Sequence, residues 1–330
     1  MANSSSDSGR PGEFELIARL FAPLATAPGA FGLTDDAALA TPPPSVDLVV
    51  TADALVEGVH FLPDDPPDAI AKKALRVNLS DLAAKGCAPA GYLLVLALPD
   101  RIDIAWLTAF AKGLGKDQAA YQLSLLGGDT TSTPGPLTIA ITAFGHVPTG
   151  TMIRRAGAKI GDLVFVSATI GDAGAGLACL KGEGGSLNAN DREFLIRRYR
   201  LPEPRVALGR SLRGIASAAL DVSDGLLGDL EHIGEVSQVG IEVRADTIPL
   251  SRAARSLLGS DALVRAATSG DDYEIAFTAP PSKAGEVRAV AAASGIAVTE
   301  IGRVVAGQGV VLLDSQGREV PVPRKGFTHF

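Results

Sequence analysis

The chain has 330 residues, of which 46% are hydrophobic, and a formal net charge of −7. This length is enough for two domains with buried cores. The acidic balance argues against binding to nucleic acid or to an anionic membrane, and suits a site that collects divalent cations. The two cysteines, Cys87 and Cys179, fit neither a zinc site nor a disulfide scaffold, so we expect a cytoplasmic protein.

The first half of the chain reads as alternating helices and strands after a polar start. Residues 1–11 lack the apolar segment of a signal peptide, and we expect a disordered tail there. No run of about 18 uncharged apolar residues occurs that would span a membrane. Periodicity and turn residues predict helices at 13–25, 68–85 and 104–120, and strands at 47–51, 91–98, 122–126 and 137–147.

The second half repeats this alternation. It predicts strands at 162–167, 219–222 and 272–278, helices after 171–176 and at 203–216, 225–239 and 282–294, and short strands within 301–322. Turn residues at 148–161 predict a boundary, with an N-terminal α/β domain at 12–148 and a C-terminal α/β domain at 149–330.

Five acidic loops stand out from this background. They are Asp35-Asp36, Asp53, Gly127-Gly128-Asp129, Asp221-Val222-Ser223-Asp224-Gly225 and Gly270-Asp271-Asp272, with Asp81 as a further acid on a predicted helix. Asp and Gly are ordinary turn residues, so a single loop carries little weight. Four of the five border a predicted strand, however, and carboxylates that converge require cations. Oxygen ligands suit Mg²⁺, which also bridges to phosphate oxygens. The loops together therefore predict a magnesium-dependent enzyme that handles a nucleotide phosphate.

The donors that would bind phosphate are less defined. The glycines at 171–176 open a predicted helix, and such N-termini bind anions, although close packing explains them equally well. Arg154 and Arg155 either reach a phosphate or are solvated, and His60 is either a ligand contact or a packed residue. No Walker or protein-kinase motif occurs, and no nucleophile motif surrounds Ser80 or Ser223.

Several strings, taken in order, resemble one known family, the thiamine-monophosphate kinases. They are GEFELIARL, TDDAAL, TADALVEGVHF, KALRVNLSDLAAKG, LLGGDTT, RRAGAKIGD, LDVSDGL, SGDDYEIAF and KGFTHF, which run from about Gly12 to Phe330. The resemblance implies a two-domain α/β (α+β) ATP-binding fold of the aminoimidazole ribonucleotide synthetase type, with the N-terminal sheet pairing across a homodimer. It implies phosphorylation of thiamine monophosphate by ATP to thiamine diphosphate plus ADP, by direct in-line transfer assisted by several Mg²⁺ ions.

The resemblance also implies roles for individual residues. The magnesium ligands would be Asp36, Thr51, Asp53, Asp81, Asp129, Asp221 and Asp224. The ATP contacts would be Gly128, Asp129, Arg155 and Ser223, and the contacts to thiamine phosphate would be His60, Asp271 and Phe327. Among these, Asp129, Arg155 and Asp224 would act on the phosphoryl group in transfer.

Three positions depart from the family pattern. Ala52 stands where a hydroxyl residue is usual, Asp271 where glutamate is common, and Phe327 where tyrosine or tryptophan is usual. None removes a charge, so we expect activity with altered affinity.

Two alternatives stay open. Another member of the same superfamily is disfavoured because selenophosphate synthetase needs an earlier cysteine than Cys87, and the hydrogenase-maturation relative needs a C-terminal cysteine. A catalytically silent nucleotide- or thiamine-binding regulator is the other.

Overall fold

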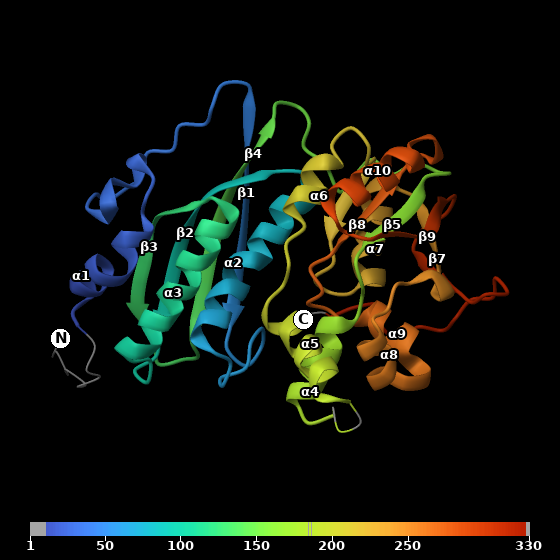
Figure 1. Ribbon diagram of the computed structural model, residues 1–330. Coiled ribbons are helices and arrows are strands. Elements are labelled where there is room, and N and C mark those ends of the chain that lie inside the picture. Colours follow the sequence, from blue (N-terminus) through green and yellow to red (C-terminus); the bar gives the residue numbers. More distant parts are fainter. Residues whose placement is uncertain (1–10, 184, 186, 328–330) are drawn as a thin grey trace. The chain divides into compact units, whose positions relative to one another are not determined.

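The computed structural model describes residues 11–183, 185 and 187–327, which form two compact units (Figure 1). The first unit comprises the described residues up to Leu82 together with Ala88–Pro148, and the second comprises Ala83–Cys87 and the described residues from Thr149 onward. Apart from Pro11, the expected disordered tail lies outside the described residues. Within the described ranges, no helix is long and apolar enough to cross a membrane.

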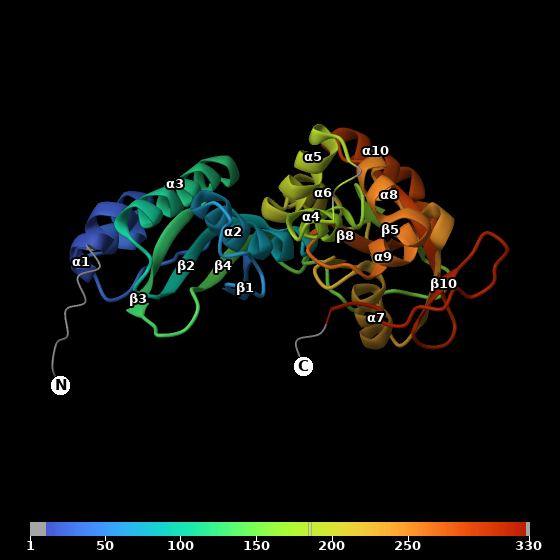
Figure 2. The ribbon, with the colours of Figure 1, turned by 90° about the horizontal axis from the view of Figure 1, so that it is seen from below.

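The first unit is built on a four-stranded sheet in the order β1-β4-β2-β3. The strands are β1 (Val46–Val56), β2 (Ala88–Leu98), β3 (Ser124–Ser132) and β4 (Thr138–Pro148). Strand β4 runs antiparallel to both β1 and β2, whereas β2 and β3 are parallel. Helices α2 (Pro67–Ala84) and α3 (Ile104–Tyr121) cover one face of this sheet (Figure 2).

The predicted N-terminal helix is divided into short turns of different pitch. It comprises α1 (Glu13–Leu16), a π-helical turn (Ile17–Phe21) and a 3-10 turn (Ala22–Leu24), and a further 3-10 segment follows at Pro28–Leu33. Helix α3, in contrast, is regular. The Asp103 side chain accepts the Trp106 N–H at 2.7 Å, which caps the helix, and Leu107, Phe110 and Leu114 are buried at helical spacing.

Alternation along the strands gives the first sheet two different faces. On β2, Leu94, Leu96 and Leu98 are buried, whereas Val95 between them is 40% exposed. Strand β1 exposes Leu48 and Val50, by 41% and 53%. The exposed apolar residues lie on the face opposite α2 and α3, where the described part of this unit places no helix (Figure 2).

The second unit is built on a six-stranded sheet in the order β10-β7-β9-β5-β8-β6. Its strands are β5 (Leu163–Ser167), β6 (Ala218–Asp221), β7 (Gly240–Arg244), β8 (Ile275–Ala279), β9 (Val298–Val305) and β10 (Val310–Leu313). Its helices are α4 (Asp172–Leu180), α5 (Ala189–Arg200), α6 (Val206–Ser211), α7 (Leu226–Ser237), α8 (Arg252–Leu258), α9 (Ala262–Thr268) and α10 (Ala284–Ser294). Short 3-10 turns lie at Ala245–Thr247, Gly259–Asp261 and Pro281–Lys283.

Neighbouring strand residues point to opposite faces of this second sheet, and both faces carry apolar side chains. Helices cover both faces and bury these side chains. Val164 and Val166 of β5 pack into a core with α4, α7, α8 and α9. Phe165 between them packs with α6, α10 and the 83–84 end of α2, where it stacks on Phe277. The strands at the centre of this unit are therefore apolar on both faces.

The structure corrects several expected elements. Gly127, Gly128 and Asp129 lie inside β3, which continues to Ser132, and do not form a loop after the strand. Strand β8 begins at Ile275, so Asp272 belongs to the irregular segment before it. Helices α5, α8 and α9 and strand β7 were not predicted.

Candidate functional site

A cavity of about 690 Å³ lies at the β3 edge of the first unit. Its apolar wall includes Phe14 and Phe21 from the N-terminal turns, and its polar wall includes Asp36, Gly128 and Asp129. The volume lies within the range of small-molecule sites, which are roughly 300–1,000 Å³. The acidic loop with Asp36 and the acidic segment of β3, which are far apart in the sequence, thus line one cavity together.

The opposite edge of the same sheet carries a second group of predicted ligands. The hydroxyl of Thr51 on β1 donates a hydrogen bond to the carboxylate of Asp81 on α2. Asp53 lies two residues further along β1 and therefore points to the same helix-covered face. The sequence thus correctly placed Asp81 on a helix, and the structure brings it to Thr51.

The register of the sheet shows how far apart these two groups are. Asp53 pairs with Ile141, Ile141 with Leu94, and Leu94 with Gly128, so one row of residues crosses the sheet from edge to edge. Three strand spacings of about 4.8 Å separate β1 from β3, which gives roughly 14 Å. Asp53 and Asp129 of one chain therefore cannot share a metal ion within this sheet.

His60 is held in a defined orientation after β1. Its Nδ1 accepts the backbone N–H of Val56 at 3.0 Å, so a neutral ring carries its proton on Nε2. The buried Lys73 donates from Nζ to the carbonyl oxygen of His60 at 2.8 Å. The backbone thus fixes the orientation of the imidazole ring from its Nδ1 side.

The second unit brings together four predicted residues that span about a third of the chain. The backbone N–H of Asp271 donates to the carbonyl of Ser223 at 2.8 Å, and the N–H of Phe327 donates to the carbonyl of Asp224 at 2.8 Å. Asp271 has φ of 71°, an uncommon backbone conformation for a residue other than glycine. Such outliers cluster at functional sites, because they persist only where the surrounding contacts impose them.

A residue that sequence reasoning missed lies beneath this loop. One carboxylate oxygen of Asp229 accepts the backbone N–H groups of Ser223, Asp224 and Gly225 at 3.0, 3.0 and 3.1 Å. Burial, and then the neighbouring Asp224 carboxylate, raise the pKa of Asp229 to about 7, and the N–H donors oppose this rise. Asp229 follows the predicted acidic loop within a helix, and helix periodicity alone does not distinguish it.

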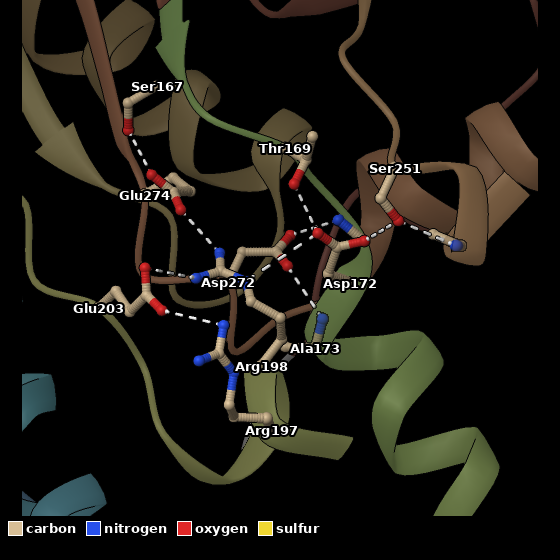
Figure 3. A network of polar contacts seen from close by, with 12 residues as sticks. Ser167, Thr169, Asp172, Ala173, Arg197, Arg198, Glu203, Ser251, Asp272 and Glu274 are labelled. Carbon is tan, nitrogen blue, oxygen red and sulfur yellow. Dashed lines mark hydrogen bonds and ion pairs between the residues drawn. The ribbon is translucent and has the colours of Figure 1, made fainter. Parts of the chain in front are cut away.

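The start of helix α4 does not form the phosphate site that its glycines suggested. The carboxylate of Asp272 accepts the N–H groups of Gly171 and Ala173 at 2.6 and 3.2 Å, as Figure 3 shows. Asp272 is 1% exposed, and this burial raises its pKa well above the usual range. The protein's own carboxylate thus occupies the anion position at this helix terminus.

A buried ion network continues from Asp272 to Glu274, which directly precedes the start of β8. Glu274 accepts hydrogen bonds from Ser167 at 2.5 Å, from Arg198 at 2.6 Å and from two nitrogens of Arg205 at 2.5 and 2.7 Å. The side chain of Arg198 is 5% exposed and that of Glu274 is fully buried. Figure 3 shows the ion pair between them. These charges are paired with one another, so the network fixes the segment that carries Asp271.

The remaining predicted residues occupy separate places. Asp221 ends β6, and the exposed Arg155 lies between β4 and β5 without an ion pair to any described residue. In the described part of the chain, no three His, Cys, Asp or Glu side chains are close enough to hold a metal ion together. Apart from Asp221, the predicted ligands form three oxygen-rich groups, one at each edge of the first sheet and one in the second unit.

Comparison with known families covers most of the chain. Residues 34–147 match the family model "AIR synthase related protein, N-terminal domain", and residues 159–315 match "AIR synthase related protein, C-terminal domain". Thiamine-monophosphate kinase of Caulobacter vibrioides is 45% identical over 97% of this chain and 91% of that protein. The enzyme of Escherichia coli K12 is 40% identical over 97% of this chain and 98% of its own length.

Solved structures agree with this relationship. Thiamine-monophosphate kinase from Stenotrophomonas maltophilia superposes with a TM-score of 0.80 at 43% identity, over 87% of this chain and 91% of that one. The structure of AaThiL complexed with AMPPCP and TMP superposes with a TM-score of 0.78 at 32% identity, over 92% of this chain and 97% of that one. The hydrogenase maturation protein HypE in complex with ATP gives 0.79 over 96% of both chains, but at 19% identity this likeness shows the fold alone.

Proposed function

This chain belongs to the thiamine-monophosphate kinase family, and we propose that its three oxygen-rich groups hold Mg²⁺ and substrate phosphates during the reaction. The reaction is the ATP-dependent phosphorylation of thiamine monophosphate to thiamine diphosphate, with release of ADP. The observation that supports our assignment of residues is the convergence of Ser223, Asp224, Asp271 and Phe327. Backbone hydrogen bonds join these positions, which the resemblance assigns separately to ATP, metal and thiamine phosphate.

The chemistry follows from the acceptor. A phosphate monoester has a second pKa of about 6 and is mostly dianionic near pH 7, so its oxygen is a nucleophile that needs no general base. In a direct in-line transfer, this oxygen forms a bond to the γ-phosphorus while the bond to the bridging oxygen of ADP breaks. ADP leaves with the electron pair, and no phosphoenzyme forms.

The obstacle to this transfer is repulsion between two polyanions. We assign Arg155 to the phosphoryl group in transfer, and the Nε2–H of His60 to the phosphate of the acceptor. Asp271 and Phe327 would orient the thiamine part. Binding and alignment by these groups would supply most of the catalysis, as in other phosphoryl transfers.

The residues present fit magnesium by their chemistry. Asp36, Asp53, Asp81, Asp129 and Asp224 offer carboxylate oxygens and Thr51 offers a hydroxyl, which are the hard ligands that this ion prefers. When bound, Mg²⁺ would neutralise charge on the ATP phosphates. The cavity with Asp36, Gly128 and Asp129 is the position we propose for part of the nucleotide.

We also propose a homodimer, in a reducing cytoplasm where the buried free thiols of Cys87 and Cys179 stay reduced. The β1 and β3 edges of one sheet are too far apart for their carboxylates to share an ion. In a dimer, the β1 edge of one copy could lie near the β3 edge of the other. The uncovered apolar face with Leu48, Val50 and Val95 is the surface that such a partner would cover.

An assay of substrate choice tests the activity. Purified protein with ATP and Mg²⁺ is offered thiamine, thiamine monophosphate and aminoimidazole precursors in parallel, and ADP and thiamine diphosphate are quantified. Only the monophosphate should be converted. Binding of ATP and thiamine monophosphate without ADP release would instead indicate a silent regulator.

The metal assignment is tested at Asp81. Asp81→Asn removes the charge that would attract Mg²⁺, and by analogy with other metal sites the half-activating Mg²⁺ concentration should rise by roughly 10–100-fold. Asp68→Asn on the same helix is the matched control, because Asp68 only pairs with Lys72 at the surface. Full turnover of Asp81→Asn at limiting Mg²⁺ would show that the role is wrong.

A further inference from the structure

The three backbone N–H groups of residues 223–225 are all hydrogen-bonded to a single acceptor atom. All three N–H groups donate to the same oxygen, Oδ2, of Asp229, which is 4% exposed. Successive N–H groups that converge in this way form a nest that normally attracts an external anion such as phosphate. Here the anion position is already taken by a side chain of the following helix, α7.

The acceptor side of the same loop is occupied as well. The carbonyl of Ser223 accepts the N–H of Asp271, and the carbonyl of Asp224 accepts the N–H of Phe327, both at 2.8 Å. The side chains of Ser223 and Asp224, in contrast to their backbone groups, have no hydrogen-bond or ion-pair partner among the described residues, and both residues are half-buried.

We propose that Asp229 is a positioning residue, whose single carboxylate oxygen fixes residues 223–225 so that Ser223 and Asp224 meet the nucleotide and its metal with side chains. The proposal rests on the function proposed above for Ser223 and Asp224. By filling the nest, Asp229 keeps phosphate away from the start of α7. The loop then offers an oxygen-rich surface to metal-bound phosphate in place of bare N–H groups.

The geometry predicts an unusual order among substitutions. Because all three hydrogen bonds end on one oxygen, the amide oxygen of Asp229→Asn can accept them all, although the charge is lost. Asp229→Ala leaves three buried N–H groups without an acceptor, and Asp229→Glu keeps the charge but displaces the oxygen by one methylene. The acceptor position, and not the charge, should decide activity.

The test compares these variants in the full-length enzyme with ATP, Mg²⁺ and thiamine monophosphate. Residues that orient ligands of a metal typically change affinity or activity by roughly 10–100-fold when they are lost. We expect Asp229→Ala and Asp229→Glu to raise the KM for ATP and the half-activating Mg²⁺ concentration by about this factor, and Asp229→Asn to stay within about threefold of wild type.

Asp162→Ala is the matched control for lost stability. Asp162 is also a buried aspartate of the second unit that accepts a backbone N–H, from Lys159 at 3.0 Å, but it lies outside the proposed site. Asp162→Ala should lower the melting temperature without changing the half-activating Mg²⁺ concentration. If Asp229→Ala does not fold, the contrast between Asp229→Glu and Asp229→Asn carries the same test.

The outcomes separate the two proposals. Unchanged ATP and Mg²⁺ parameters in folded Asp229→Ala or Asp229→Glu would overturn the positioning role, and so would an Asp229→Asn variant as impaired as the others. Asp224→Asn tests the underlying function independently. If it leaves the Mg²⁺ dependence unchanged, the assignment of the loop itself is wrong, whatever the Asp229 variants do.

Discussion

Gly128 provides the sharpest test of how the β3 edge is built. A Cβ atom at this position would lie 1.8 Å from the carbonyl oxygen and 2.7 Å from the carbonyl carbon of Leu94 on β2. The residue also has φ of 154°, a conformation that side chains disfavour. Gly128→Ala would therefore force the paired strands apart, because backbone atoms cannot rotate away as a side chain can.

The magnitude follows from these two terms. Overpacking alone costs about 1–3 kcal/mol, and the backbone conformation costs about 1–3 kcal/mol more. Together they predict a loss of about 2–6 kcal/mol, which at about 2–4 °C per kcal/mol lowers the melting temperature by roughly 4–24 °C. The displacement should also move Asp129, so the KM for ATP should rise in the protein that remains folded.

The neighbouring glycine is the control. A Cβ atom at Gly127 would lie 3.4 Å from the Leu93 side chain, which is an ordinary contact, and its φ is not positive. Gly127→Ala should change stability by less than about 1 kcal/mol. Calorimetry and urea unfolding of both variants give the comparison. Equal melting temperatures for Gly127→Ala and Gly128→Ala would refute the close approach of β3 to Leu94.

Two further predictions concern the buried ions and the uncovered sheet. Glu274→Ala leaves the guanidinium groups of Arg198 and Arg205 buried without their shared carboxylate. The free energy of unfolding measured in urea should fall by about 3–5 kcal/mol. A decrease below about 1 kcal/mol would contradict the pairing. Val50→Asp places a charge on the uncovered face beside β4. If the proposed dimer uses this face, light scattering should find dimers for the wild type and monomers for the variant; a dimeric variant would place the interface elsewhere.

Much of the fold could be predicted because it is local. The periodicity of residues 104–120 predicts α3 within one residue of its observed end at Tyr121. The apolar run of 91–98 similarly predicted β2 from Gly91 to its last residue, Leu98. These signals arise from neighbours in the chain, and any tertiary environment that buries one face satisfies them.

The acidic segments were harder, because Gly and Asp favour turns in isolation. Gly127 and Gly128 are nevertheless in a strand, since pairing with β2 supplies hydrogen bonds that outweigh local preference. Asp272 was predicted in a strand and instead caps helix α4, a hundred residues earlier in the chain. No local sequence pattern predicts a contact between residues that are this far apart in the chain.

By itself, the sequence determined the chemical groups of this protein: carboxylate-rich segments, two thiols, an acidic net charge, and ordered motifs that identify the thiamine-monophosphate kinase family. Only the tertiary structure decided which of these groups meet. It placed Asp53 and Asp129 at opposite edges of one sheet, joined Ser223 to Asp271, and filled two anion positions with Asp229 and Asp272. The reason is that side-chain chemistry belongs to each residue, whereas proximity between distant residues is created by strand register and packing.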